Sequence, residues 1–224
     1  MLPALARIDT WIFDLDNTLY PASCDLFGLI DQRMTAYVAR LLGVDPIEAR
    51  AVQKTYFREH GTTLSGLMLS HGVDPHEFLA FVHDIEMDAV AEDRRLVRAV
   101  AALPGRKLIF TNGDAPYARR VLARLGLSDS FEAIHDIHAC AYQPKPHAPS
   151  YRAMCDTLAI DSTRALFVED MARNLPPAKA LGMTTVWINN GSEDGDREVD
   201  RAAIDYEIAE IGAWLDEILE GEAR

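Results

Sequence analysis

The sequence predicts an α/β protein with a Rossmann-like, parallel, five-stranded core sheet and an all-helical domain inserted after the first strand. Three observations support this fold class. Short apolar runs rich in Ile, Val and Phe alternate with helical patterns, which is typical of a parallel sheet with right-handed crossovers. One such run lies near the N-terminus and four follow residue 100. The stretch between them shows helical periodicity, so it interrupts the sheet after its first strand.

Each apolar run has the length of a buried strand and is followed by a turn or a helical pattern. The expected strands are Ile8–Phe13, Lys107–Thr111, Ala133–Ile137, Ala165–Val168 and Thr184–Ile188. The expected helices of this part are 115–126, 147–159, 172–181 and, near the end of the chain, about 208–219. The polar, acidic stretch 189–200 is expected to be a surface loop.

Helix start and stop signals divide the inserted stretch into several helices. A first helix carries apolar residues at helical spacing between 26 and 42. Asp45-Pro46 and Asp74-Pro75 each combine an aspartate N-cap with a proline at the first helical position. Gly61 and Gly72 are expected to end the second and third helices. The predicted division is an α/β core of 1–21 and 100–224 and a helical cap of 22–99.

The composition narrows the range of partners. The chain has 224 residues, of which 49% are apolar and 25% are charged, an ordinary globular composition that is long enough for a sizeable core. A net charge of −13 argues against binding to a nucleic-acid polymer or to an anionic membrane surface. It does not exclude a small anionic substrate, because a bound divalent cation makes a site locally positive.

Several features favour a cytoplasmic protein. No apolar run approaches the roughly 20 residues of a membrane span, and the first residues do not resemble a signal peptide. Three scattered cysteines, Cys24, Cys140 and Cys155, have no paired spacing and are expected to be reduced. The sequence leaves a monomer and a homodimer as alternatives.

Polar residues collect at the ends of successive predicted strands. Ligands bind at the carboxyl ends of the strands in an open α/β sheet, so these residues are expected to meet at one edge. Together they offer carboxylates for a hard cation, hydroxyl and amide donors, and one ammonium group. They are Asp14 and Asp16 after the first strand, Thr111, Asn112 and Gly113 after the second, Lys145 before a helix, and Glu169 and Asp170 after the fourth.

Each of these groups has an ordinary structural explanation when it is taken alone. Asp14 is suited to capping a turn or helix, and Thr111-Asn112-Gly113 has the composition of a strand-to-helix turn. Lys145 alone is typical of a solvated side chain, and Glu169-Asp170 of a helix cap. The order of all four groups at successive strand ends is what these separate explanations do not account for.

This constellation resembles the haloacid dehalogenase-like superfamily of hydrolases, most of which are phosphatases. The resemblance rests on DLDNT after a strand, TN after the next strand, a lysine before a helix, and an acidic pair after a further strand. The helical insertion that follows the first motif is similar to that superfamily's type I cap. Within the superfamily, WIFDLDNTLYPAS and TYFREHGTTLSGLM resemble the pyrimidine 5′-nucleotidase branch.

The resemblance implies roles for the carboxylates. Asp14 is the expected nucleophile, which forms an aspartyl-phosphate, and Asp16 is the expected general acid and base. Mg²⁺ is the expected cofactor, held by Asp14, the Asp16 backbone carbonyl and Asp170. Glu169 stands where the superfamily often has Asp or Gly, so its contact with the metal is expected to be either direct or through water.

The resemblance also implies how the substrate is held. Thr111, Asn112, Gly113 and Lys145 are expected around the transferring phosphoryl group. Selectivity is expected to come from the cap, because caps and lids close over substrates. The cap candidates are His60, for which contact with substrate and a structural role are alternatives, and Thr63, which offers a hydroxyl; Tyr20 is expected either to line the pocket or to pack beneath it.

The expected activity is Mg²⁺-dependent hydrolysis of a small phosphomonoester, with a pyrimidine nucleoside 5′-monophosphate as the favoured substrate. Phosphoglycolate or a sugar phosphate is the alternative on the same machinery. Dehalogenation of a 2-haloacid needs neither a leaving-group acid nor Mg²⁺, so Asp16 argues against it. The full set of carboxylates, threonine and lysine argues against a binding module without catalysis.

Overall fold

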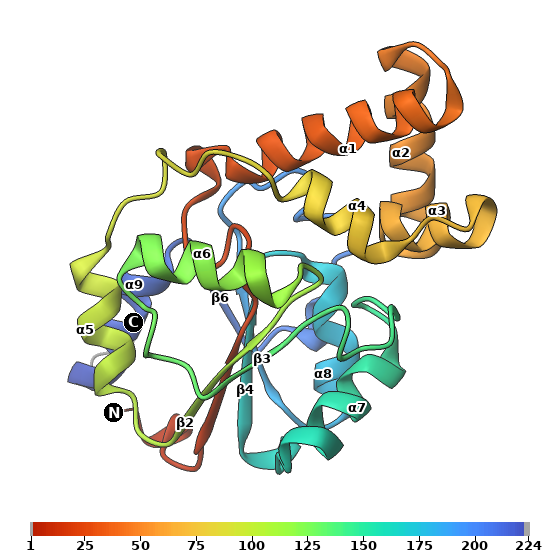
Figure 1. The fold of residues 1–224 in the computed structure, drawn as a ribbon. Coiled ribbons are helices and arrows are strands. Elements are labelled where there is room, and N and C mark those ends of the chain that lie inside the picture. The colour runs from red at the N-terminus through yellow and green to blue at the C-terminus, as the bar shows by residue number, and fades with distance from the viewer. Residues whose placement is uncertain (1, 222–224) are drawn as a thin grey trace.

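The computed structural model describes residues 2–221 and contains a six-stranded, fully parallel sheet (Figure 1). The strand order is β3-β2-β1-β4-β5-β6, so β1 and β4 are the two central strands. The strands are β1 Thr10–Phe13, β2 Arg106–Phe110, β3 Ala133–His135, β4 Ala165–Glu169, β5 Thr184–Ile188 and β6 Tyr206–Ile208. The predicted parallel α/β class is therefore confirmed.

The sixth strand corrects the predicted strand number. β6 pairs in parallel with β5 at the edge of the sheet, and the final helix begins only at Ile211. Glu210 accepts hydrogen bonds from the backbone N–H groups of Gly212 and Ala213, which defines that start. A strand of three residues is too short to show the alternation of apolar and polar residues that distinguishes a strand from a helix. The sequence pattern therefore predicts only the helix from about 208 to 219 here.

Nine helices accompany the sheet within residues 2–221. They are α1 Leu26–Leu42, α2 Pro46–His60, α3 Thr63–His71, α4 Pro75–Val82, α5 Arg94–Ala102, α6 Ala115–Leu125, α7 Ala148–Leu158, α8 Leu175–Ala180 and α9 Ile211–Glu220. Figure 1 shows α1 to α4 grouped beyond one end of the sheet, α5, α6 and α9 on one side of it, and α7 and α8 on the other. None of these helices combines the length and apolar content needed to cross a bilayer.

Alternation along β1 divides the interior into two layers. All four strand residues are buried. Trp11 and Phe13 pack into the cluster that includes residues of α5, α6 and α9, whereas Ile12 packs into the cluster with α7 and α8. Because this central strand is covered on both faces, it carries the apolar run Trp11–Phe13, and the polar residue Asp14 follows at the strand end.

The helical insertion begins and ends its helices as the capping signals predict. The carboxylates of Asp45 and Asp74 accept hydrogen bonds from the first-turn N–H groups of α2 and α4. Gly61 follows α2 with φ = +83°, a backbone conformation that residues other than glycine rarely adopt. A Cβ at Gly61 would lie 3.1 Å from Pro144 Cγ, so the insertion approaches the core loop closely here.

α5 packs against α9 beside the sheet. Asp93 caps α5 by accepting hydrogen bonds from the N–H groups of Arg95 and Leu96. α5 therefore belongs to the layer beside the sheet.

Candidate active site

Asp14 lies at the carboxyl end of the central strand β1. Its backbone N–H donates to the carbonyl of Val168 on β4 at 2.9 Å, which continues the β1–β4 ladder by one residue and fixes the backbone at this point. The side chain is buried, with the residue only 6% exposed. A buried carboxylate without a charged partner is costly, so its neighbours decide whether it stays ionised.

Lys145 is the charged partner of Asp14. Its ammonium group donates to Asp14 Oδ1 at 2.6 Å, to Glu169 Oε2 at 2.7 Å and to the carbonyl of Phe110 at 3.0 Å. Burial disfavours the ammonium form, but Asp14 and Glu169 outweigh it and raise the pKa of Lys145. The lysine is thus a fixed cation, and all three of its N–H donors have acceptors.

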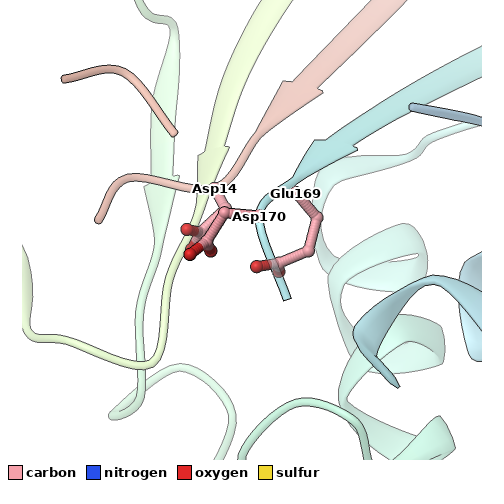
Figure 2. A group of neighbouring side chains, drawn as sticks. All are labelled: Asp14, Glu169 and Asp170. Carbon is pink, nitrogen blue, oxygen red and sulfur yellow. The ribbon is translucent and has the colours of Figure 1, made fainter. Parts of the chain in front are cut away.

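Three carboxylates converge beside this lysine. Oxygens of Asp14, Glu169 and Asp170 all lie within 4.8 Å of one another, and Figure 2 shows the three side chains directed toward a common point from the ends of β1 and β4. Burial and the Glu169 charge raise the pKa of Asp14 to about 7 and that of Asp170 well above its usual range. When all three carboxylates are ionised, one ammonium leaves two negative charges uncompensated, and this repulsion contributes to the raised pKa values of Asp14 and Asp170. A divalent cation would supply the missing positive charge.

The donor set fits a hard cation, since carboxylate oxygens are the ligands that Mg²⁺ and Ca²⁺ prefer. The three carboxylates differ in how far they are already engaged. Glu169 accepts from Lys145 through Oε2 and from the Met171 N–H through Oε1. Asp14 accepts from Lys145 through Oδ1 and from the Thr18 hydroxyl through Oδ2, at a longer 3.2 Å. Glu169 is therefore placed to hold Lys145 as well as to contribute charge.

Asp16 has different partners from Asp14. The hydroxyl groups of Tyr20 and Tyr117 both donate to Asp16 Oδ1, each at 2.6 Å. Tyr20 belongs to the turn after β1, whereas Tyr117 lies on α6. Asp14 and Asp16 therefore have different environments, because Asp14 is paired with an ammonium group and Asp16 with two neutral hydroxyl donors.

The turn after β2 places Thr111, Asn112 and Gly113 next to Lys145. Asn112 and Lys145 are joined twice: the Lys145 N–H donates to Asn112 Oδ1 at 2.8 Å, and Asn112 Nδ2 donates to the Lys145 carbonyl at 3.2 Å. The Gly113 N–H donates to the Thr111 hydroxyl oxygen at 3.0 Å. The hydroxyl proton of Thr111 is then free to be donated to a ligand.

A cavity of about 290 Å³ joins this strand edge to the helical insertion. The structure brings most of the predicted site residues to its wall: Asp14, Asp16, Thr63, Thr111, Asn112, Gly113, Lys145, Glu169 and Asp170. Tyr20 and His60 are not part of that wall. Tyr20 is buried against Asp16, and His60 ends α2 with its ring beside Tyr56 and its Nε2 3.9 Å from Glu59 Oε2.

The cavity wall also contains residues that the sequence did not single out. Asp31 of α1 and Gln53 and Lys54 of α2 line the helical side, where Asp31 accepts from Gln53 at 2.6 Å and pairs with Lys54 at 3.0 Å. Gly191–Asp194, part of the stretch expected to be a surface loop, also line it, and Glu193 pairs with Lys54 at 3.1 Å. These are ordinary surface residue types at helical or loop positions, so no local signal distinguishes them.

Arg173 ties the core to the insertion on the same side. Its Nη2 donates to the carbonyl of Gly61 at 3.3 Å, and its guanidinium lies 4.3 Å from the ring centre of Phe57. Both Arg173 and Phe57 line the cavity. Asn174, one residue further, is buried, and its Oδ1 has no hydrogen-bond partner among residues 2–221.

The fold and this site define a class of protein: a hydrolase built on a parallel α/β sheet, with a carboxylate cluster at the end of its central strand and a helical insertion facing it. The chain belongs to the haloacid dehalogenase-like hydrolases, a family that it matches over residues 8–182.

Curated relatives agree with this membership. The chain is 26% identical over 197 residues to phosphate metabolism protein 8 of Saccharomyces cerevisiae, a match that covers 77% of this chain and 59% of the yeast protein. It is 31% identical over 121 residues to phosphoglycolate phosphatase of Rhodospirillum rubrum, covering 54% of this chain and 50% of that protein. The chain thus spans little more than half the length of these two relatives.

Solved structures share the fold along nearly the whole chain. A haloacid dehalogenase-like phosphatase from Thermococcus onnurineus superposes with a TM-score of 0.64 at 22% identity, covering 96% of this chain and 99% of that one. The magnesium-bound hydrolase YfnB from Bacillus subtilis gives 0.62 at 15% identity, covering 95% and 99%. The L-2-haloacid dehalogenase of Xanthobacter autotrophicus gives 0.56 at 17% identity, covering 96% and 100%.

Proposed function

We propose that the chain is a Mg²⁺-dependent phosphomonoesterase that acts through an aspartyl-phosphate on Asp14. The observation that supports this proposal most strongly is that two carboxylates line one cavity but have different hydrogen-bond partners. Asp14 is held by the Lys145 ammonium, as a nucleophile must be if it is to stay ionised, and Asp16 is held by two neutral hydroxyls, as an acid and base must be if it is to exchange a proton.

In the first half-reaction a carboxylate oxygen of Asp14 attacks phosphorus and the bond to the ester oxygen breaks. Asp16 donates its proton to the departing oxygen, so that an alcohol leaves. The Lys145 ammonium contacts Asp14, and the Thr111 hydroxyl lines the same cavity; the first supplies positive charge and the second a hydrogen bond to the transferring oxygens.

In the second half-reaction Asp16 takes a proton from water, and that water attacks phosphorus. The bond between phosphorus and Asp14 breaks, which releases inorganic phosphate and restores the Asp14 carboxylate. The same residue thus serves as acid and then as base, and each half-reaction returns it to the form that the other requires.

Asp14, Asp170 and the backbone of Asp16 would hold Mg²⁺, with Glu169 close by. When bound, the ion supplies the positive charge that allows a carboxylate to approach a phosphate dianion. The two negative charges that remain uncompensated when the cluster is fully ionised support this assignment, as does the magnesium bound in the structural neighbour YfnB.

For the leaving group we infer a pyrimidine nucleoside, so that UMP or CMP is the substrate. The insertion's side of the cavity offers apolar side chains together with a few polar groups, a combination that suits a nucleobase with flat faces and polar edges. The apolar residues are Phe27, Met34, Phe57, Leu64, Phe78 and Leu79, and the polar ones are Asp31, Gln53, Lys54 and Thr63.

Phosphoglycolate is the second candidate, because Lys54 lines the cavity and an ammonium suits the carboxylate of a glycolate leaving group. The relative named phosphoglycolate phosphatase also supports it. A sugar phosphate would use the same polar groups. Haloacid dehalogenation is less well supported, because a departing halide needs no proton. That reaction gives no catalytic role to Asp16 or to the two tyrosines that bind it.

The test is a phosphate-release assay with and without Mg²⁺, comparing kcat/KM for UMP, CMP, AMP, phosphoglycolate and p-nitrophenyl phosphate. The proposal expects Mg²⁺-dependent release and the highest kcat/KM for the pyrimidine nucleotides. Release that is fastest for phosphoglycolate would transfer the assignment to the second candidate. The absence of release from every substrate in the presence of Mg²⁺ would refute the phosphatase.

A further inference from the structure

The side chain of Asp16 accepts hydrogen bonds from the protein through only one of its two carboxyl oxygens within residues 2–221. Both tyrosine hydroxyls, from Tyr20 and Tyr117, donate to Oδ1, and the hydroxyl oxygens are 3.5 Å apart. Within residues 2–221 no hydrogen bond reaches Oδ2, while Asp16 lines the cavity. One carboxyl oxygen is therefore saturated by the protein and the other is left for a ligand.

Both tyrosines are buried, and each donates a hydrogen bond from its hydroxyl group to Asp16. Tyr20 and Tyr117 are 2% and 1% exposed, so no water competes for their hydroxyls. A phenol has an ordinary pKa of about 10, so both hydroxyl groups carry a proton to donate at neutral pH. A buried phenol needs a hydrogen-bond partner, and here both share one carboxylate oxygen.

The ring of Tyr117 is packed against its neighbours. Its ring stacks on His83 with 4.2 Å between the ring centres and 14° between the planes, and His83 Nδ1 lies 3.0 Å from Asp114 Oδ1. Gly113 also lies close to the ring: a Cβ there would lie 3.3 Å from Tyr117 Cδ1. The hydroxyl therefore has little freedom to move away from Asp16.

Two donors from different elements restrain a carboxyl group more than one can. Rotation about the Cβ–Cγ bond moves both carboxyl oxygens, so it would carry Oδ1 away from its donors and break both hydrogen bonds. Donors from the β1 turn and from α6 restrain that rotation. Restraining the reactive atom in this way lowers the entropic cost of reaching the transition state.

We propose that Tyr20 and Tyr117 are positioning residues for the acid–base step, which hold Asp16 through Oδ1 so that Oδ2 is the oxygen that meets the leaving group and the attacking water. This inference rests on the proposed phosphatase chemistry of Asp16. The competing explanation is that the tyrosines only satisfy a half-buried carboxylate and stabilise the fold.

The experiment compares Tyr20→Phe, Tyr117→Phe and the double variant with the wild type, in the presence of Mg²⁺. Phenylalanine fills the same space and removes only the donor. kcat/KM is measured for p-nitrophenyl phosphate, whose leaving group needs little protonation, and for an alkyl phosphate, whose leaving group needs much. Each single variant should lose about tenfold on the alkyl phosphate, and the double variant should approach the loss of Asp16→Ala, about 10²–10⁴-fold for an acid–base residue.

The p-nitrophenyl phosphate losses should be several-fold smaller. In an Asp16→Ala background, Tyr117→Phe should cost nothing further on either substrate, because there is no carboxyl left to position. Tyr151→Phe is the matched control: Tyr151 is also fully buried and donates at 2.6 Å, but to the carbonyl of Asn174. Any loss that this control causes should be equal for the two substrates.

Equal losses for both leaving groups, or an undiminished loss in the Asp16→Ala background, would overturn the positioning role and leave the phosphatase intact. A wild type that releases no phosphate from either substrate would instead overturn the proposed function, and this inference with it. Thermal unfolding of each variant shows whether the fold survives, and a folded variant with substrate-dependent loss supports the proposal.

Discussion

Lys145 Nζ lies 2.6 Å from Asp14 Oδ1, although the two residues are 131 positions apart in the chain. The contact joins the end of the central strand to the loop that precedes α7. Glu169 at 2.7 Å and the Phe110 carbonyl at 3.0 Å complete the acceptors of the ammonium group. The lysine therefore links the ends of β1, β2 and β4 around the proposed nucleophile.

Replacing Lys145 by Met should abolish activity and destabilise the metal-free protein. Met fills similar space but leaves Asp14 and Glu169 buried without a cation, an arrangement that typically costs about 3–5 kcal/mol. Urea unfolding at about pH 8 without Mg²⁺, where protonation relieves the carboxylates least, measures this cost.

Lys179→Met is the control for that experiment. Lys179 pairs with Asp205 at 2.5 Å, but its side chain is 37% exposed, so the loss should stay within about 1 kcal/mol. Equal destabilisation by the two substitutions would show that the buried contact has no special role in holding the strand ends together.

Mg²⁺ binding should strengthen as the pH rises. Burial and the Glu169 charge raise the pKa of Asp14 to about 7 and that of Asp170 well above its usual range, so protons compete with the metal in acid solution. Calorimetric titration with Mg²⁺ should give a weaker affinity at about pH 6 than at about pH 8, with proton release that is larger at pH 6. An affinity that does not change over this range would contradict the carboxylate site.

The same shifts determine how stability depends on pH. Because the folded pKa of Asp14 exceeds the ordinary value of 3.8, its contribution favours the folded state below that value and is lost as the pH rises through about 7. Metal-free protein should therefore melt at a lower temperature at about pH 8 than at about pH 5, with the largest gain from added Mg²⁺ at the higher pH.

Asp170→Asn should mainly change the Mg²⁺ requirement of the enzyme, whereas Glu169→Gln should mainly change its turnover. Asp170→Asn removes a charge from the proposed metal site and should raise the Mg²⁺ concentration needed for half-maximal activity sharply. Glu169→Gln should act more on turnover, because Glu169 accepts from Lys145 at 2.7 Å and from the Met171 N–H at 3.1 Å. Mg²⁺ titrations of activity separate the two effects; the same shift in Mg²⁺ requirement for both would place Glu169 among the direct ligands.

Lys54→Met should change substrate selectivity. Lys54 lines the cavity, and if an ammonium there binds a leaving-group carboxylate, KM for phosphoglycolate should rise about tenfold or more while KM for UMP changes little. Arg50→Met is the matched control, since Arg50 pairs with the same two carboxylates, Asp31 and Glu193, without lining the cavity. Equal effects of the two substitutions would make the role of Lys54 structural.

The sequence predicts the part of the site that depends only on the sheet. Parallel strands bring their carboxyl ends to one edge, so Asp14, Thr111 and Glu169 could be expected together once the strands were recognised. Lys145 could be expected near them, because its loop follows the third strand. The parallel sheet and the helical insertion followed from periodicity and capping residues alone.

The remainder depends on long-range packing. Tyr117 meets Asp16 across 101 positions, and Lys54 meets Glu193 across 139, and neither contact has a local pattern. They are set by the orientation of α6 and of the insertion relative to the sheet. His60 shows the same limit: the chain turns at Gly61, so it is Gly61 that approaches the core, at Pro144.

The central claim is that Asp14 is the nucleophile, and phosphate release by Asp14→Asn in the presence of Mg²⁺ tests it most directly. The amide cannot form an aspartyl-phosphate, so the purified, folded variant should release no phosphate from the best wild-type substrate. Intact-mass analysis of the same sample excludes deamidation of the introduced side chain back to a carboxylate. Sustained turnover by a variant shown to be fully amidated would contradict the covalent mechanism.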